Sequence, residues 1–165
     1  MDIIKSAGGI IYYIDTEGKI KFLLIKRQAL SGKVERVAPK GKIQPGEDEK
    51  TAAIREIGEE IGIRKDQLIR KSLLGTTSLR SGGKERGHLD KDVTYFLFKY
   101  TGDPTALRLI QGEGYIGVYK WMGIAQILNL IYYEDLREII RKGYFQIQGQ
   151  QANQSVKQQF IDSLL

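Results

Sequence analysis

Residues 41–63 carry the feature that most constrains this chain, the stretch GKIQPGEDEKTAAIREIGEEIGI. It follows the pattern G-x5-E-x7-R-E-U-x-E-E-x-G-U, in which U is a bulky aliphatic residue. Every constrained position is filled, namely Gly41, Glu47, Arg55, Glu56, Ile57, Glu59, Glu60, Gly62 and Ile63. At background frequencies of roughly 5–10% per residue, a chance match in the chain is rarer than about one in a million. The pattern therefore indicates a specific chemistry.

A helix is expected over residues 48–61. Glu47 and Asp48 place negative charge at its start, where the helix dipole favours an anion, and Gly62 is a natural C-terminal stop. Three isoleucines at helical spacing should pack on the core, namely Ile54, Ile57 and Ile61. The helix should therefore leave its other face to polar groups.

Glu56, Glu59 and Glu60 share that other face, because residues three and four apart are helical neighbours. Like charges at this spacing repel by roughly a few tenths of a kcal/mol, so a cation is expected beside them. Mg²⁺ is the natural candidate, with Mn²⁺ as a substitute, since it takes hard oxygen ligands and bridges carboxylates to phosphates. Ala52, one turn earlier, should leave space above the ions. A solvated helix face would explain E-x-x-E-E alone, but not the other filled positions.

Arg55 lies beside the acidic face, within reach of a carboxylate. A bidentate pair with Glu47, Glu56 or Glu59 would fix the geometry of the site. Arg55 is therefore interpreted as a residue that orients carboxylates and does not contact substrate. A zinc site is poorly supported, because the chain has no cysteine and one histidine.

The whole stretch matches the signature of the Nudix family, which the chain resembles. These proteins hydrolyse nucleoside diphosphates linked to another group. The resemblance implies an α/β fold, the α/β/α sandwich with a mixed sheet, in which the motif forms a loop, a helix and a loop. It implies that Glu56, Glu59 and Glu60 bind the catalytic cations, with Glu59, Glu60 and Arg55 in the catalytic machinery. Such ions neutralise the bridging phosphates and activate a water for in-line attack at phosphorus.

The general base varies within the family and often lies outside the motif. Glu113 is the candidate here, because it lies in the stretch G-E-G ahead of an expected strand, where family members often place an extra glutamate. A turn carboxylate without a catalytic role is the alternative interpretation. Asp90 and Asp92 are weaker candidates for the base.

Residues 38–47 narrow the resemblance. They read APKGKIQPGE, which is similar to the pattern P-K-G-K/H-x-x-P-G-E of the diadenosine tetraphosphate hydrolases and the related diphosphoinositol polyphosphate phosphohydrolases. The opening SAGG of residues 6–9 also resembles that branch. Ala38 and Lys42 depart from the animal-type pattern, where a larger aliphatic residue and histidine are usual. This favours the bacterial-like members and leaves the substrate open.

Basic residues near the motif are candidates for gripping a phosphate chain. Lys40 and Lys42 flank the acidic helix, and Arg80 and Lys91 bound a basic, glycine-containing loop that also holds His88. A mobile surface loop is the alternative interpretation. Purine recognition usually needs an aromatic platform, for which the candidates are Tyr95, Tyr115 and Tyr119, although aromatic residues in strands are more often core.

The remaining chain fits one domain over residues 1–143 and an extension over residues 144–165. Strands are expected at 3–14 (interrupted by Gly8 and Gly9), 19–26, 34–37, 68–77, 93–100 and 115–121, with a loop at 39–46. A helix is expected at 124–141, with a break near 129–133. The extension has apolar residues at spacing four, and is expected to be an amphipathic helix packed on its own domain or on a dimer partner. The protein is therefore expected as a monomer or homodimer.

Composition limits the classes of function. The 165 residues carry a net charge of +6 and no cysteine, which excludes disulfides and suits a polyanionic ligand. No signal peptide or membrane span is evident, so a cytoplasmic location without a membrane partner is expected. The leading hypothesis is magnesium-dependent hydrolysis of a dinucleoside polyphosphate. Its rivals are other substrates (diphosphoinositol polyphosphate, RNA 5′ end, ADP-ribose, oxidised nucleoside triphosphate), a non-catalytic nucleotide sensor and a nucleic-acid-binding module.

Overall fold

The computed structural model describes residues 3–28, 32–80, 90–108 and 115–165. Within them seven strands form one mixed sheet of order β3-β2-β1-β6-β5, while β4 pairs with β1 and β7 with β2. The strands are β1 (Ile4–Ile14), β2 (Ile20–Gln28), β3 (Val34–Val37), β4 (Lys40–Lys42), β5 (Leu68–Leu79), β6 (Lys91–Tyr100) and β7 (Tyr115–Met122). The helices are α1 (Glu49–Ile61), the 3₁₀ helix η1 (Lys65–Gln67), α2 (Ile124–Leu130) and α3 (Glu134–Ser163).

The strand β1 organises the sheet, because different parts of it pair with different neighbours. It runs parallel to β6 along most of its length. On its other edge it pairs antiparallel first with β4, from Ser6 with Lys42 to Gly8 with Lys40, and then with β2. The strands β4 and β2 therefore share one edge of β1 and follow each other along it.

Gly8 and Gly9 allow neighbouring elements to approach β1 closely. A Cβ atom at Gly8 would clash with the carbonyl oxygen of Pro39, and one at Gly9 would lie 2.5 Å from Cδ1 of Ile57 in α1. The expected interruption of the strand at these glycines is wrong, since β1 is continuous. Their role is to admit β4 and α1.

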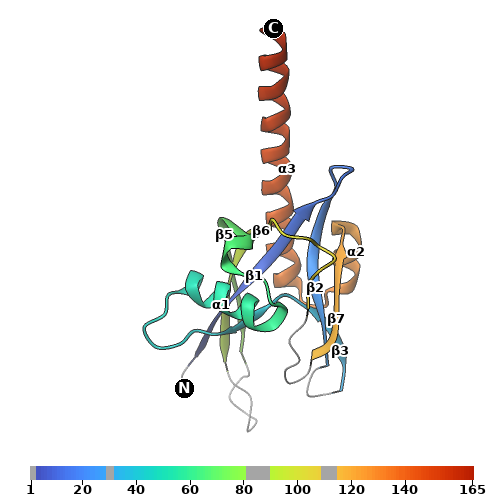
Figure 1. Cartoon of the computed structure of the whole chain (residues 1–165). Helices are drawn as coiled ribbons and strands as arrows, with labels where there is room; N and C mark the ends of the chain where they lie inside the picture. The colour runs from blue at the N-terminus through green and yellow to red at the C-terminus, as the bar shows by residue number, and fades with distance from the viewer. Residues whose placement is uncertain (1–2, 29–31, 81–89, 109–114) are drawn as a thin grey trace.

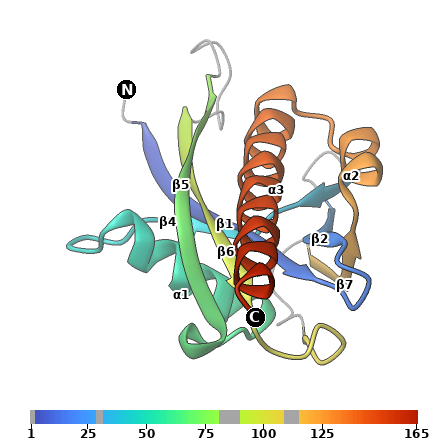
Figure 2. The ribbon, with the colours of Figure 1, turned by 90° about the horizontal axis from the view of Figure 1, so that it is seen from above.

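Helices cover both faces of the sheet (Figures 1 and 2). The helix α1 packs on one face through a cluster that includes Ile57 and Ile61, with Ile54 at its edge. The helices α2 and α3 pack on the other face through a second cluster that includes Ile127 and Ile140. The expected α/β class with a mixed sheet is confirmed, as is the core face of the motif helix.

Two expected elements differ from the structure. The loop over residues 39–46 is wrong at its start, because Lys40–Lys42 pairs with β1 as the short strand β4. The helix expected to end at residue 141 continues through the extension, which is helical as expected, because α3 runs unbroken from Glu134 to Ser163 and projects far beyond the sheet (Figure 1). None of the helices in the described part of the chain is long and apolar enough to cross a membrane.

Candidate functional site

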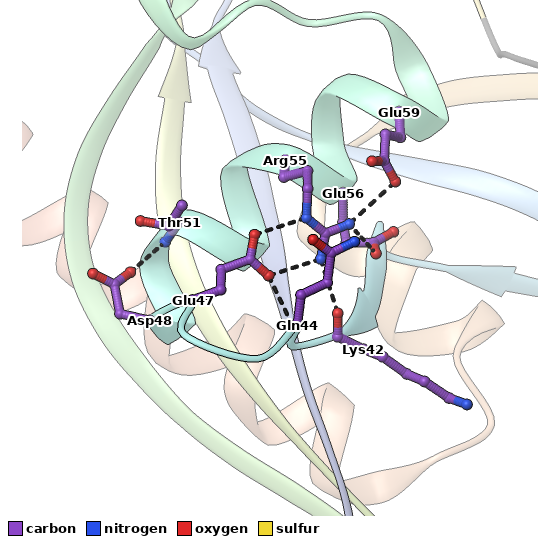
Figure 3. A network of polar contacts seen from close by, with 8 residues as sticks. All are labelled: Lys42, Gln44, Glu47, Asp48, Thr51, Arg55, Glu56 and Glu59. Carbon is purple, nitrogen blue, oxygen red and sulfur yellow. Dashed lines mark hydrogen bonds and ion pairs between the residues drawn. The ribbon is translucent and has the colours of Figure 1, made fainter.

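The start of α1 is set by local hydrogen bonds (Figure 3). The Asp48 side chain caps the helix by accepting from the Thr51 backbone N–H at 2.7 Å. In the preceding loop, the backbone N–H of Gln44 donates to Glu47 Oε1 at 3.0 Å. The helix ends at Gly62, whose φ of 70° is a left-handed conformation suited to glycine. The loop and both helix ends are therefore stabilised by residues of the motif itself.

Arg55 is the centre of the polar network in Figure 3. Its guanidinium donates to both carboxylate oxygens of Glu47, at 2.7 and 2.9 Å, and to the backbone carbonyl of Lys42 at 2.8 Å. One of its nitrogens, Nη1, also donates to Glu56 at 2.8 Å and to Glu59 at 3.2 Å. Arg55 thus contacts two of the three proposed metal ligands, and joins the loop before α1 to the acidic face of the helix.

The ion pair with Arg55 changes the titration of Glu47. The guanidinium, together with the N–H of Gln44, lowers the Glu47 carboxyl pKa from 4.5 to about 2. In the same way Glu47 raises the pKa of Arg55 above its ordinary value. Both groups therefore stay charged over the whole range in which such a protein works.

The carboxylate of Glu56 lies directly over Gly41 in β4. A Cβ atom at position 41 would overlap the carboxylate carbon and both oxygens of Glu56. This explains why the motif starts with glycine, a requirement that the spacing alone does not reveal. The Glu56 side chain is largely covered, at 14% exposed, whereas that of Glu59 is 57% exposed. Ala52 does not lie above the acidic face as expected, since it is fully buried in the core under α1.

Three lysines from β4 and β6 share one face of the sheet. Directly paired residues lie on the same face, and alternate residues of a strand do too. The pairs Gly8 with Lys40, Ser6 with Lys42 and Ile4 with Lys91 therefore place the three lysines together. These lysines come from separate segments, and the sequence predicts that they bind phosphate. Strand β1 brings them to one surface.

The titration of Lys40 shows which groups surround it. Burial, together with the nearby charges of Lys91 and Arg27, lowers its pKa from 10.5 to about 8, against the opposing effect of Glu60 and Glu35. Lys91 is shifted in the same direction, by burial and by the charges of Arg27 and Lys42. Arg27, Lys40, Lys42 and Lys91 thus form a cationic cluster whose charges act on one another, and Glu60 acts on one member of it, Lys40.

Arg80 is not brought to this cluster. Its Nη1 lies 2.8 Å from Asp92, which also accepts from Lys5 Nζ at 2.8 Å and Ser78 Oγ at 2.9 Å. Asp92 and Lys91 are adjacent in β6, so their side chains point to opposite faces of the sheet. The Arg80, Lys5 and Ser78 donors hold the pKa of Asp92 well below its ordinary range, which makes Asp92 a poor general base.

Several candidates lie outside the described residues or away from solvent. Glu113 and His88 lie outside the described part of the chain, as does the side chain of Tyr115. Tyr95 is 3% exposed in the core, and burial raises its pKa. Tyr119 lies in β7, is half-buried, and its hydroxyl donates to the carbonyl of Pro104 at 3.4 Å. Tyr95 therefore offers no stacking surface, and the hydroxyl of Tyr119 is engaged within the protein.

A tyrosine pair that the sequence analysis missed lies at the junction of α2 and α3. Tyr132 is 75% exposed and packs edge-on against Tyr133, with Lys33 Nζ 4.2 Å above its ring. The Tyr133 hydroxyl donates to Glu35 at 3.3 Å, and Glu35 is one of the charges that act on Lys40. The consecutive tyrosines in an expected helix break were the available signal.

The side chains of the motif fit a hard divalent cation by their chemistry. They offer carboxylate oxygens without nitrogen or sulfur, and Arg55 takes one oxygen each from Glu56 and Glu59. The absence of a side chain at Gly41 makes room for the Glu56 carboxylate. Within residues 3–28, 32–80, 90–108 and 115–165, however, no three acidic, histidine or cysteine side chains converge on one point.

Comparisons with known proteins agree on one family. A family model described as the NUDIX domain matches residues 5–143. The bis(5′-nucleosyl)-tetraphosphatase (asymmetrical) of Caenorhabditis elegans is 33% identical over 141 residues, which cover 85% of this chain and 94% of that protein. The RNA pyrophosphohydrolase of Rhodospirillum rubrum is 33% identical over 101 residues, 56% of this chain and 59% of that one. A crystal structure of a C. elegans Ap4A hydrolase binary complex superposes with a TM-score of 0.74 at 31% identity, covering 89% and 99% of the two chains.

Proposed function

The chain belongs to the Nudix family of hydrolases, and we propose that its substrate is a dinucleoside polyphosphate such as diadenosine tetraphosphate. The observation that carries the proposal is the cationic cluster gathered on one face of the sheet, in which the charge of Glu60 acts on Lys40. A tetraphosphate chain needs several positive groups along its length, and the bond that breaks must lie beside the carboxylates. The similarity to a tetraphosphatase over most of both chains supports the same substrate.

Glu56, Glu59 and Glu60 are the residues that would hold Mg²⁺, with Mn²⁺ as a substitute. When bound, such an ion supplies neutralising charge for the phosphates and a more acidic water. Arg55 keeps Glu56 and Glu59 oriented toward the site, and Glu47 in turn fixes Arg55. Lys40, Lys42 and Lys91 would bind the phosphate chain. The carboxylate of Glu113 remains our candidate to take the proton of the attacking water.

Tyr132 is proposed as a platform for one purine ring. It is the more exposed member of the tyrosine pair, and Tyr133 connects it through Glu35 to the surroundings of Lys40. Base stacking on an aromatic ring contributes roughly 1–3 kcal/mol. This arrangement would hold the nucleoside end of the substrate while the lysines hold its phosphates.

A triphosphorylated RNA 5′ end is the second candidate substrate. The similarity to an RNA pyrophosphohydrolase favours it, although that match covers little more than half of either chain. The cationic cluster would serve an RNA triphosphate as well as a dinucleotide. The two substrates differ beyond their phosphates, since one ends in a second nucleoside and the other continues as a strand.

A substrate panel with Mg²⁺, read by product chromatography, tests the proposal. It contains diadenosine tetraphosphate, ADP-ribose, oxidised dGTP, a diphosphoinositol phosphate and triphosphorylated RNA, with the Glu60→Gln protein as the inactive control. We expect preferred cleavage of the tetraphosphate to ATP and AMP. Preference for another compound would keep the chemistry and overturn the substrate. Tight nucleotide binding without turnover of any compound would support a sensor instead.

A further inference from the structure

The far half of α3 presents an uncovered apolar surface. Every residue from Ala152 onward is exposed, and the helix stands clear of the sheet (Figure 1). We define the outer stripe as the six residues Phe145, Gly149, Ala152, Val156, Phe160 and Leu164. The four large side chains of this stripe are 60–70% exposed. Such a run of exposed apolar residues on one helix usually marks an interaction surface.

The outer stripe faces away from the domain to which α3 belongs. The residues of α3 that pack on the sheet are Leu136, Ile139, Ile140, Gly143 and Ile147. At 100° per residue, the mean direction of the outer stripe differs from that of these residues by roughly 140°. Phe145 lies within the packed part of the helix and is still 60% exposed. The stripe therefore cannot be covered by the sheet of its own chain while α3 stays helical.

The charge of the projecting segment suits a second copy of itself. The chain as a whole is at +6, but Lys157 and Asp162 are the only charged residues in positions 148–165. Two such helices have little repulsion to overcome, whereas two basic domains placed side by side would repel. Pairing between copies is thus favoured only where the domains are kept apart.

We propose that the outer stripe pairs antiparallel with the outer stripe of a second copy, on a two-fold axis near Val156. In this register Phe160 lies opposite Ala152 of the other copy, and Leu164 lies close to Gly149 and Phe145. Large side chains then meet small ones, as close packing requires. A parallel pair would set Phe160 against Phe160 and leave a gap at Ala152.

The antiparallel register also separates the basic domains. Ile147 is the last residue of α3 that is buried against the sheet, nine positions before Val156. The two copies of Ile147 are then 18 residues apart along the pair, about 27 Å at 1.5 Å per residue. That exceeds the Debye length of about 8 Å at physiological salt, so the domains repel little. A stable interface needs about 800 Å² from each partner, toward which each buried phenylalanine supplies roughly 150–250 Å².

Sedimentation velocity of the full chain across a range of concentrations tests the pairing. We expect a particle of twice the chain mass of 18.7 kDa. Phe160→Glu should raise the dissociation constant by at least about 100-fold, because each dimer would bury two carboxylates in an apolar contact. Gln154→Glu adds the same charge on the far side of the helix and should leave the dimer intact. Turnover should be unchanged in both variants, which shows that each remains folded.

Single cysteines introduced into this cysteine-free chain test the orientation. Val156→Cys should form a disulfide-linked dimer on mild oxidation, and Ala152→Cys should not, because its counterpart in the antiparallel pair is Phe160. Efficient crosslinking of Ala152→Cys would establish a parallel pair and overturn the register. A wild-type chain that stays monomeric at all concentrations would overturn the proposal. This holds whether the monomer is then found to bind lipid vesicles through the stripe, or hydrogen exchange shows that the stripe is protected within a single chain.

Discussion

Glu47 and Arg55 form a two-point ion pair, with Arg55 Nε 2.7 Å from Glu47 Oε2 and Nη2 2.9 Å from Oε1. This pair ties the loop before α1 to the middle of the helix. The remaining guanidinium nitrogen, Nη1, reaches Glu56 and Glu59. The position of two proposed metal ligands therefore depends on a carboxylate that is not itself proposed to bind metal.

Glu47→Gln should destabilise the fold near neutral pH and have little effect in strong acid. The pKa of Glu47 is depressed in the folded state, from 4.5 to about 2, so its ion pair stabilises the protein above pH 4.5. That stability is lost as the pH falls from 4.5 toward 2. Urea unfolding of both proteins at several pH values measures the difference. Glu17→Gln, on the exposed turn after β1, removes the same charge as a control, and equal effects of both changes would contradict the prediction.

Arg55→Lys should weaken metal binding by about 10–100-fold, the usual effect of losing a residue that orients metal ligands. A lysine keeps the charge but cannot make the two parallel hydrogen bonds to Glu47. Calorimetric titration with Mg²⁺ or Mn²⁺ measures the affinity without reference to turnover. Lys50→Arg, on the exposed first turn of α1, serves as the control. Unchanged affinity in Arg55→Lys would show that the network in Figure 3 does not orient the ligands.

Glu59→Gln and Glu60→Gln should each lower kcat by at least about 100-fold. This is more than the loss usually caused by removing a residue that only orients a metal ligand. Without metal, the free energy of unfolding should stay within about 1 kcal/mol for Glu59→Gln, because its contact with Arg55 is an exposed ion pair. Turnover assays and urea unfolding check the two halves of this prediction. Glu49→Gln, on the same helix, serves as the control. Near-native turnover in either Glu59→Gln or Glu60→Gln would mean that our metal assignment is wrong.

Gly41→Ala should lower turnover, because the added methyl group must displace the Glu56 carboxylate. The control is Gly58→Ala in the same motif, where the nearest heavy atom to the new Cβ is 3.4 Å away. That change should stabilise α1 by about 1 kcal/mol, since alanine is the better helix former. Steady-state kinetics and thermal unfolding of the two variants separate the local clash from a general effect of removing glycine. An active Gly41→Ala would contradict the proposed place of Glu56.

Lys40 should make kcat/KM depend on pH. Its pKa is lowered to about 8, so the lysine loses its positive charge, and its attraction for phosphate, as the pH rises through 8. We expect kcat/KM for diadenosine tetraphosphate to fall above that pH, and Lys40→Arg to remove this limb because arginine stays charged. A pH–rate profile of both proteins checks it. The same alkaline limb in both proteins would assign the titration to another group.

Tyr132→Ala should raise KM for dinucleotides by roughly 5- to 150-fold, which corresponds to the 1–3 kcal/mol of base stacking. Tyr132→Trp keeps an aromatic surface and should retain binding. Inorganic tripolyphosphate, which has no base, should inhibit all three proteins equally. If inhibition by tripolyphosphate weakens along with dinucleotide binding, Tyr132 acts on the phosphate site and is not a stacking platform.

The local structure of the site was predictable from sequence. The ends of α1, the core face of Ile57 and Ile61 and the reach of Arg55 to its carboxylates all follow from spacings within 23 consecutive residues. Helical geometry converts such spacings directly into neighbours. Ala52 was the exception, because its small side chain left its face undecided until the packing of α1 was known.

The strand side of the site was not predictable in the same way. Lys40 and Lys91 are 51 positions apart, and only the pairing of β4 and β6 with opposite edges of β1 brings them together. The sequence favoured Arg80 and Tyr95 as site residues just as strongly. In the structure, however, Arg80 pairs with Asp92 on the face of the sheet opposite the lysines, and Tyr95 is enclosed in the core. A single strand does not reveal which partner it pairs with or which face is covered.

The sequence by itself determined the family, the reaction class and the internal geometry of the motif helix, because those depend on residues that are neighbours along one turn of chain. The tertiary structure decided which lysines gather on one face of the sheet, which tyrosine reaches solvent and which side of α3 is left uncovered. These depend on contacts between distant segments, where register and sheet face set the outcome.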